Sequence, residues 1–248
     1  MIHIRSSAMV NRFIKIYLFI MLLSSSFSLA SPQPRLENFH KITSTVLKPV
    51  YAPLAKEIAK KFNLKEKKGI AIDLGSGPGD LIIELCKVTK NLHWVNADIN
   101  PDYFPGFIKR ASDAGFGNRV SAMFADAKYL PFRDDYAEII VSRGSFQMWG
   151  DLKAGLSEVY RVLKPGGTAY IGRGFSTDLP VEVAKEIRSK QNKNGKGLKY
   201  DVNGTAETMK SIMQELNIRN FNIIIPKPPG AGNIKYGLWL EFHKPDKI

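Results

Sequence analysis

Cysteine is almost absent from this 248-residue chain, which contains only Cys86. A single thiol cannot form an intrachain disulfide or a cysteine zinc cluster, and we predict no metal site. Cys86 falls in a helix-like segment beside Ile82, Ile83 and Leu85. These apolar neighbours predict a small packing residue rather than a nucleophile.

Acidic residues are also scarce relative to basic ones. The chain carries 23 Asp and Glu against 36 Lys and Arg, a formal net charge of +13. Such a surplus suits an acidic partner: nucleic acid, anionic lipid or an acidic substrate. The densest basic run, Lys185–Lys199, lacks the interleaved aromatic residues on which single-stranded nucleic acids stack. We interpret it as a solvated loop, with a binding patch as the alternative, so nucleic acid is not the favoured partner.

The apolar block Ile16–Leu23 is shorter than the roughly 20 residues that a membrane-spanning helix needs. Basic residues precede this block, and small residues stand at Ser28 and Ala30 after it. This pattern predicts a secretory signal over residues 1–30 with cleavage after Ala30. An uncleaved membrane anchor is the alternative. We therefore expect the protein to be exported or membrane-anchored, and a cytoplasmic location is less favoured.

A glycine-rich turn, Asp73-Leu74-Gly75-Ser76-Gly77-Pro78-Gly79, is the most informative feature of the chain. It follows the apolar run Ile70–Ile72 and precedes the helix-like segment Asp80–Cys86, an order typical of strand, turn and helix. Glycine has no side chain and accepts positive φ, so a ligand can lie against bare backbone at such a turn. The acid that ends the strand is placed to bind a cation or a hydroxyl group.

The spacing of the glycines separates two kinds of ligand. A dinucleotide-binding fingerprint reads G-x-G-x-x-G. Here the glycines stand at 75, 77 and 79, and Asp80 follows them. An acid at that position would repel a pyrophosphate, whereas it would tolerate a ligand that carries an ammonium group and no phosphate. A purely structural turn is the remaining alternative.

Further along the chain, acids stand where the next predicted strands end. The segment Leu92–Asp98 reads as a strand whose final acid lies about 20 residues beyond the glycine turn, where a nucleoside ribose is held by its hydroxyls. Val120–Ala125 reads as a third strand that is followed by Asp126-Ala127, and Ala137–Ser142 as a fourth. The carboxyl ends of parallel strands share one edge of the sheet, so these residues are expected to meet at one site.

A helix with one apolar face is predicted over Asp151–Leu163. It runs into the sequence RVLKPGG and then the strand Thr168–Gly172. Together with the DLGSGPG turn and the two strand-ending acids, this order of motifs resembles the class I S-adenosylmethionine (SAM)-dependent methyltransferases. The similarity is to the small-molecule, methyltransferase-11-like type and extends over roughly Tyr51–Gly172.

This resemblance implies an α/β fold with a Rossmann-like, seven-stranded, mostly parallel sheet. Helices would cover both faces, and the last strand would be antiparallel. The cofactor would be SAM, with Asp126 and Ala127 beside the adenine. The cofactor-binding residues that it implies are Asp73, Gly75, Gly77, Gly79, Asp98, Ile99, Asp126, Ala127 and Ser142.

Three regions follow from these readings: the leader at 1–30, an N-terminal helical lid at 31–64 and the SAM-binding domain at 65–248. We expect the lid helix to be broken near Lys48-Pro49 and again near Ala52-Pro53. After the fifth strand, helices are predicted over Leu179–Gln191 and Thr205–Leu216, and strands over Phe221–Ile225 and Tyr236–His243.

No catalytic residue stands out. In this family the segment after the fourth strand faces the methyl group, and here it lacks the N-P-P-F/Y motif of methylases that act on nucleic-acid bases and amides. Arg143 in this segment could hold a substrate carboxylate or phosphate through two hydrogen bonds. It could equally pair with Asp126 or Asp98. Tyr51 and Tyr129 are weaker candidates.

The favoured function is SAM-dependent methyl transfer to a small-molecule or lipid-like acceptor, and Arg143 suggests an anionic one. An RNA or other nucleic-acid methyltransferase is the alternative enzyme. A SAM-binding module without catalysis is the alternative of another class. Membrane contact would come through the N-terminal segment, and the sequence does not indicate an oligomeric state.

Overall fold

The computed structural model describes residues 45–192 and 201–247, which belong to one compact unit spanning residues 42–248. The predicted leader, its cleavage after Ala30 and the first part of the predicted lid lie outside the described residues. Within the described ranges, no helix has the length and apolar character to cross a membrane.

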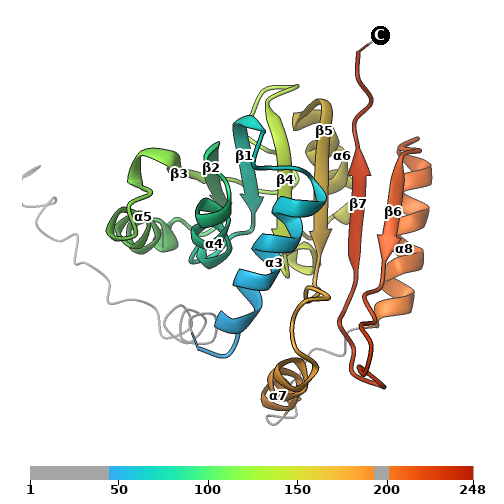
Figure 1. The fold of residues 1–248 in the computed structure, drawn as a ribbon. Coiled ribbons are helices and arrows are strands. Elements are labelled where there is room, and N and C mark those ends of the chain that lie inside the picture. Colours follow the sequence, from blue (N-terminus) through green and yellow to red (C-terminus); the bar gives the residue numbers. More distant parts are fainter. Residues whose placement is uncertain (1–44, 193–200, 248) are drawn as a thin grey trace, which may run out of the picture. The chain divides into compact units, whose positions relative to one another are not determined.

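The fold is built on a single seven-stranded sheet in the order β3-β2-β1-β4-β5-β7-β6 (Figure 1). β7 is antiparallel to both of its neighbours, β5 and β6, and the other six strands run in one direction. The predicted fold class is confirmed. The strands are β1 Lys68–Leu74, β2 Asn91–Asp98, β3 Val120–Phe124, β4 Ala137–Arg143, β5 Leu163–Gly172, β6 Phe221–Ile224 and β7 Trp239–His243.

Strand order reverses at the centre of the sheet. From β1 the chain moves outward through β2 to β3, and it then returns to place β4 on the other side of β1. In open α/β sheets, ligands bind beyond the carboxyl ends of the strands at such a reversal. The glycine turn follows β1 and therefore lies at this position.

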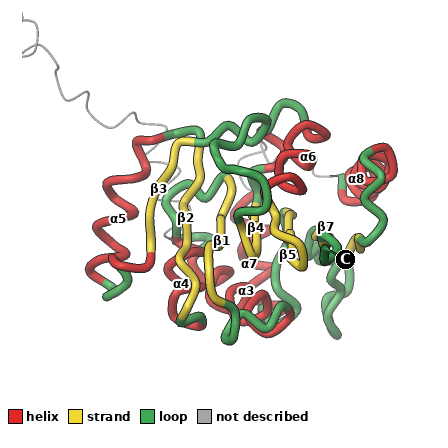
Figure 2. The backbone as a smooth tube through the Cα atoms, turned by 90° about the horizontal axis from the view of Figure 1, so that it is seen from above, coloured by secondary structure: helices red, strands yellow, loops and turns green. Residues whose placement is uncertain are grey.

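Helices cover both faces of the sheet (Figure 2). The buried apolar side chains form two cores. One core includes residues of α3, α4, α5 and α7, and the other includes residues of α6 and α8. The helices are α3 Lys48–Lys61, α4 Asp80–Val88, α5 Phe104–Asp113, α6 Leu152–Val162, α7 Val181–Asn192 and α8 Val202–Glu215, with short 3₁₀ turns η1 Pro101–Tyr103, η2 Gly117–Arg119 and η3 Phe146–Met148.

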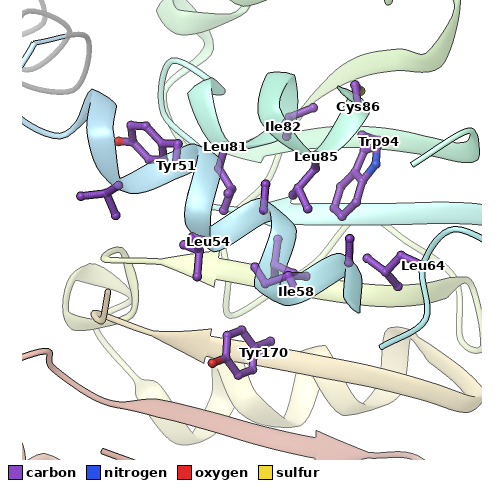
Figure 3. Close-up of a cluster of buried hydrophobic side chains, with 14 of the residues drawn as sticks. Tyr51, Leu54, Ile58, Leu64, Leu81, Ile82, Leu85, Cys86, Trp94 and Tyr170 are labelled. Atoms are coloured by element: carbon purple, nitrogen blue, oxygen red, sulfur yellow. The ribbon is translucent and has the colours of Figure 1, made fainter. Parts of the chain in front are cut away.

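The expected break at Ala52-Pro53 is wrong, because α3 continues through Pro53. Proline removes one backbone hydrogen bond and usually kinks a helix interior. Here the apolar side of α3 is packed into the core, where Leu54 and Ile58 are 0% exposed (Figure 3). We attribute the continuity of the helix to this burial.

Local contacts move several element ends away from their predicted positions. α8 begins before the predicted Thr205 because Asp201 caps it, its Oδ1 accepting a hydrogen bond from the Asn203 N–H at 3.1 Å. β7 begins after the predicted Tyr236, because Gly237 has a left-handed φ of 84° and interrupts the extended backbone. The packing role of Cys86 is confirmed: it is buried in α4, and burial raises its thiol pKa to about 11.

The burial of α3 predicts a large stability cost for truncating its apolar face. Leu54→Ala should lower the free energy of unfolding by about 2–5 kcal/mol, since a buried leucine leaves a cavity. Lys56→Ala, an exposed change on the same helix, should stay within about 0.5 kcal/mol of the wild type. Urea denaturation measures both. Equal stability of the two variants would mean that α3 is a peripheral lid rather than part of the core.

Candidate active site

The glycine turn places bare backbone at the carboxyl edge of the sheet. Gly75, Gly77 and Gly79 have φ values of 67°, 55° and 80°, which side-chain-bearing residues rarely adopt. A Cβ atom at Gly75 would collide with the Ser145 side chain, and one at Gly79 with the ring of Phe107. Both backbone conformation and close packing therefore require glycine in this turn.

Asp98 is fixed against the turn by two backbone hydrogen bonds. Its Oδ2 accepts from the Gly77 N–H at 2.7 Å, and its Oδ1 accepts from the Asn100 N–H at 2.9 Å. Asn96 adds a second link by donating from Nδ2 to the Gly77 carbonyl at 3.0 Å. Burial raises the pKa of Asp98, while these N–H donors lower it. A carboxylate has about four acceptor sites, so Asp98 can also accept from ligand hydroxyls.

Asp73 is a second buried carboxylate at the same edge, near the end of β1. Its Oδ2 accepts a hydrogen bond from the Ser76 hydroxyl at 2.9 Å. Burial raises the Asp73 pKa from its usual 3.8 to about 7; the hydrogen bond opposes this rise and the charge of Asp98 adds to it. Asp80 stands in the first turn of α4, where a phosphate would otherwise be attracted. The acids around the turn therefore favour a cationic ligand, which would also stabilise the ionised form of Asp73, over a phosphate.

The residues expected around an adenine follow β2 and β3. Ile99 is 61% exposed and offers apolar surface directly after Asp98. Asp126 is half-buried, and its Oδ1 accepts from the Lys128 N–H at 2.9 Å. Ala127 is buried. The structure thus brings these three residues to the same edge of the sheet as the glycine turn.

Ser142, the last of the expected cofactor-binding residues, lies near the end of β4. It is fully buried, and its hydroxyl hydrogen-bonds to that of Ser145 at 2.7 Å. Ser145 in turn donates to the Leu74 carbonyl at 3.0 Å and accepts from Trp149 Nε1 at 3.1 Å. Sequence reasoning missed Ser145, which fills the space beside Gly75. Only its position after the fourth strand could have drawn attention to it.

The three candidate catalytic residues do not gather into one catalytic group. Arg143 is half-buried, and its guanidinium lies 5.5 Å from the centre of the Tyr51 ring. Burial raises the Tyr51 pKa to about 12, which favours the protonated phenol at neutral pH. Tyr129 is 77% exposed, in the loop after β3. Within the described part of the chain, Arg143 forms no ion pair with Asp126 or Asp98.

Glu57 joins α3 to the loop that follows β5. It accepts hydrogen bonds from the Tyr170 hydroxyl at 3.1 Å, the Ser176 hydroxyl at 2.6 Å and the Thr177 N–H at 3.0 Å. Because Tyr51 lies on the same helix, this junction fixes its position relative to the end of β5.

An open pocket of about 450 Å³ lies between the segment after β4 and the start of α8. The sequence did not predict it. Its walls combine apolar side chains with hydroxyl, amide and carboxylate groups: Phe146, Gln147, Gly150, Leu152, Asp201, Gly204, Thr205 and Thr208.

The fold and the site together define an α/β protein whose glycine turn suits SAM better than a dinucleotide. Comparisons with known proteins agree with this interpretation. Residues 71–167 match the model of a methyltransferase domain. A crystal structure from Methanococcus maripaludis, assigned as a SAM-dependent methyltransferase, superposes with a TM-score of 0.74 at 27% identity, covering 89% of this chain and 99% of that one.

Two named enzymes are similar over part of their length. The ubiquinone/menaquinone biosynthesis C-methyltransferase of Vibrio vulnificus is 35% identical over 97 residues, which is 39% of this chain and 37% of that enzyme. The chloroplastic 2-methyl-6-phytyl-1,4-hydroquinone methyltransferase of Arabidopsis thaliana is 34% identical over 98 residues, 40% of this chain and 28% of that enzyme. The matches thus span well under half of either enzyme. Over the matched region and in its fold, the chain is thus similar to the class I SAM-dependent methyltransferases.

The position of Asp98 predicts its contribution to cofactor affinity. In Asp98→Ala, the ribose hydroxyls of SAM lose their acceptor, which should weaken binding by about 1–3 kcal/mol. Isothermal titration calorimetry measures this affinity. Asp113→Ala, an exposed control whose carboxylate pairs with Lys109 at 2.7 Å, should bind SAM as the wild type does. Unchanged affinity in Asp98→Ala would refute the ribose assignment.

The raised pKa of Asp73 predicts a pH dependence of stability. The folded protein holds a proton on Asp73 up to about pH 7, whereas the unfolded chain releases it near the usual pKa of 3.8. The contribution of Asp73 to the free energy of unfolding is therefore fully present below about pH 4. It decreases as the pH rises from there through about 7, by at most about 1.4 kcal/mol per pH unit. Asp73→Asn should remove this slope in denaturation measured between these pH values. Parallel pH profiles of wild type and variant would contradict the assignment.

Proposed function

We propose that this chain transfers the methyl group of SAM to a small-molecule, lipid-like acceptor. The observation that carries the proposal is the carboxyl edge itself, where Asp73, Asp98 and the glycine turn form one hydrogen-bonded unit. Bound SAM would supply an activated methyl group on a positively charged sulfur. The acids around the turn suit that charge, and Asp98 suits the ribose.

The residues at this edge support catalysis by positioning rather than by proton transfer. The Tyr51 phenol has its pKa raised to about 12. Of the two described histidines, His93 is near the start of β2 and His243 ends the antiparallel β7, so both lie toward the opposite edge. Orienting two reactants can by itself supply a large part of a rate enhancement. The acceptor would then bring its own nucleophilic atom.

An electron-rich ring such as a hydroquinone meets this requirement, because its carbon atoms are nucleophilic without an enzyme base. The names of the Vibrio and Arabidopsis relatives specify quinone biosynthesis and a phytyl hydroquinone. The segment after β4 offers apolar surface for such a compound, since Met148 there is 73% exposed. These features support a lipid-like acceptor over a nucleic acid.

Methyl-labelled SAM tests the proposal. The protein should transfer label into the lipid-soluble, small-molecule fraction of an extract of its host. Label in RNA would favour the nucleic-acid alternative, and SAM binding without transfer to any fraction would favour a non-catalytic module. Asp98→Ala should reduce transfer at low SAM and Asp113→Ala should not, which ties the label to this site.

A further inference from the structure

The exposed side of α3 carries a row of lysines. Lys48, Lys56 and Lys60 are all exposed, and their spacing of eight and four residues places them on one side of the helix. The helix crosses one face of the sheet from edge to edge (Figure 1). Its first turn brings Tyr51 beside Arg143 at the end of β4, and its last turn leads through a short loop into β1. The row therefore runs from the candidate active site to the opposite edge.

Further lysines continue this row beyond the end of α3. The loop to β1 contributes the exposed Lys65, and β1 begins with the exposed Lys68. One exposed acid, Glu66, stands between them. Lys68 pairs in register with Asn91 of β2, so the exposed Lys90 lies close to it. We define the lysine stripe as Lys48, Lys56, Lys60, Lys65, Lys68 and Lys90.

The charge of the lysine stripe is not neutralised by neighbouring acids. Among residues 45–192 and 201–247, none of its members forms an ion pair. The neighbouring Lys61 does so, with Glu241 at 2.8 Å. Glu57, the acid of α3, accepts hydrogen bonds from Tyr170 and Ser176 instead. The stripe therefore presents uncompensated positive charge to solvent.

The other face of the sheet has the reverse balance of charge. Successive residues of β1, Ala71 and Ile72, belong to different apolar cores, so α3 covers one face of the sheet and α6 and α8 cover the other. The exposed charged residues at α6, α8 and their caps are mostly acidic: Asp151, Asp201, Glu207 and Glu215 against Lys153 and Lys210. A protein polarised in this way turns its α3 face toward an anionic surface.

The composition of the lysine stripe favours a lipid surface over a nucleic acid. The two aromatic residues in α3 and the loop after it, Tyr51 and Phe62, are buried and leave no platform on which bases could stack. The stripe contains lysine and no arginine, whose planar fork suits specific phosphate recognition. Between its lysines stand the exposed Pro49 and the half-buried Ala52. Apolar residues among cations suit the interfacial region of a membrane.

We propose that the lysine stripe docks the protein on an anionic phospholipid surface, with α3 lying along that surface. The inference concerns a surface outside the candidate active site, so it stands independently of the proposed function. Each lysine near an anionic bilayer strengthens binding about fivefold, and salt screens this attraction. Docking through α3 would place the Tyr51 end of the site at the rim of the contact, where a lipid-like acceptor would enter from the membrane.

Vesicle flotation with the full chain tests the proposal. The wild-type protein should float with vesicles of phosphatidylcholine mixed with phosphatidylserine and much less with vesicles of phosphatidylcholine alone. Binding should fall at least about tenfold between about 0.1 M and about 1 M salt, since the Debye length shortens from about 10 to about 3 Å. Combining Lys48→Gln, Lys56→Gln and Lys60→Gln should weaken binding to the mixed vesicles roughly 100-fold.

A matched control removes the same amount of charge from the other face. Lys153→Gln, Lys210→Gln and Arg219→Gln replace three exposed cations in α6, in α8 and after α8. This triple variant should bind the mixed vesicles within about threefold of the wild type, because its cations are far from the docked face and are screened by salt. Both triple variants should bind S-adenosylhomocysteine and melt as the wild type does, because the replaced side chains are exposed.

Four results would overturn the inference. Absence of binding to the mixed vesicles would remove the membrane partner. An equal loss in both triple variants would make net charge responsible, and equal binding to both kinds of vesicle would make apolar residues responsible. Tighter binding to a fluorescently labelled duplex RNA than to the mixed vesicles, abolished by the three α3 replacements, would make the stripe a nucleic-acid site. Transfer of label from SAM into the lipid-soluble fraction, measured separately, would leave the proposed function intact in each case.

Discussion

The hydrogen bond from the Gly77 N–H to the Asp98 carboxylate is the contact on which the rest of the site depends. It joins the end of β2 to the turn between β1 and α4 at 2.7 Å. Because Gly77 has a left-handed φ of 55°, its N–H can point at that carboxylate. Asn96 holds the next peptide unit of the turn by donating to the Gly77 carbonyl. The turn, the strand end and the α4 N-terminus are thereby fixed as one unit.

Crowding of carboxylates around that unit determines what it can bind. Burial raises the pKa of both Asp73 and Asp98, and the charge of Asp98 adds to the rise at Asp73. A ligand that brings positive charge relieves this repulsion, whereas a phosphate intensifies it. Electrostatics thus distinguishes this site from a dinucleotide site, although the strand, turn and helix are common to both.

Features encoded within short segments could be predicted from the sequence, and contacts between distant segments could not. Local pattern and resemblance predict the glycine turn, the acid that ends β2, the acid that follows β3 and the antiparallel last strand. The close approach of Ser145 to Gly75 joins residues that are about 70 positions apart in the sequence. The contact between Arg143 and Tyr51 joins residues about 90 positions apart, beyond the reach of any local sequence pattern. The path of α3 through Pro53 likewise depends on core packing, which no local rule for proline takes into account.

One helix serves three purposes at once. α3 buries Leu54 and Ile58 in the core, carries Tyr51 to the site and, through Glu57, accepts hydrogen bonds from the end of β5 and the loop after it. A substitution that loosens its packing therefore also displaces Tyr51. This coupling would limit directed evolution toward new acceptors. Mutations that reshape the α3 side of the site would also lower the free energy of unfolding, and the protein would then tolerate fewer further destabilising mutations.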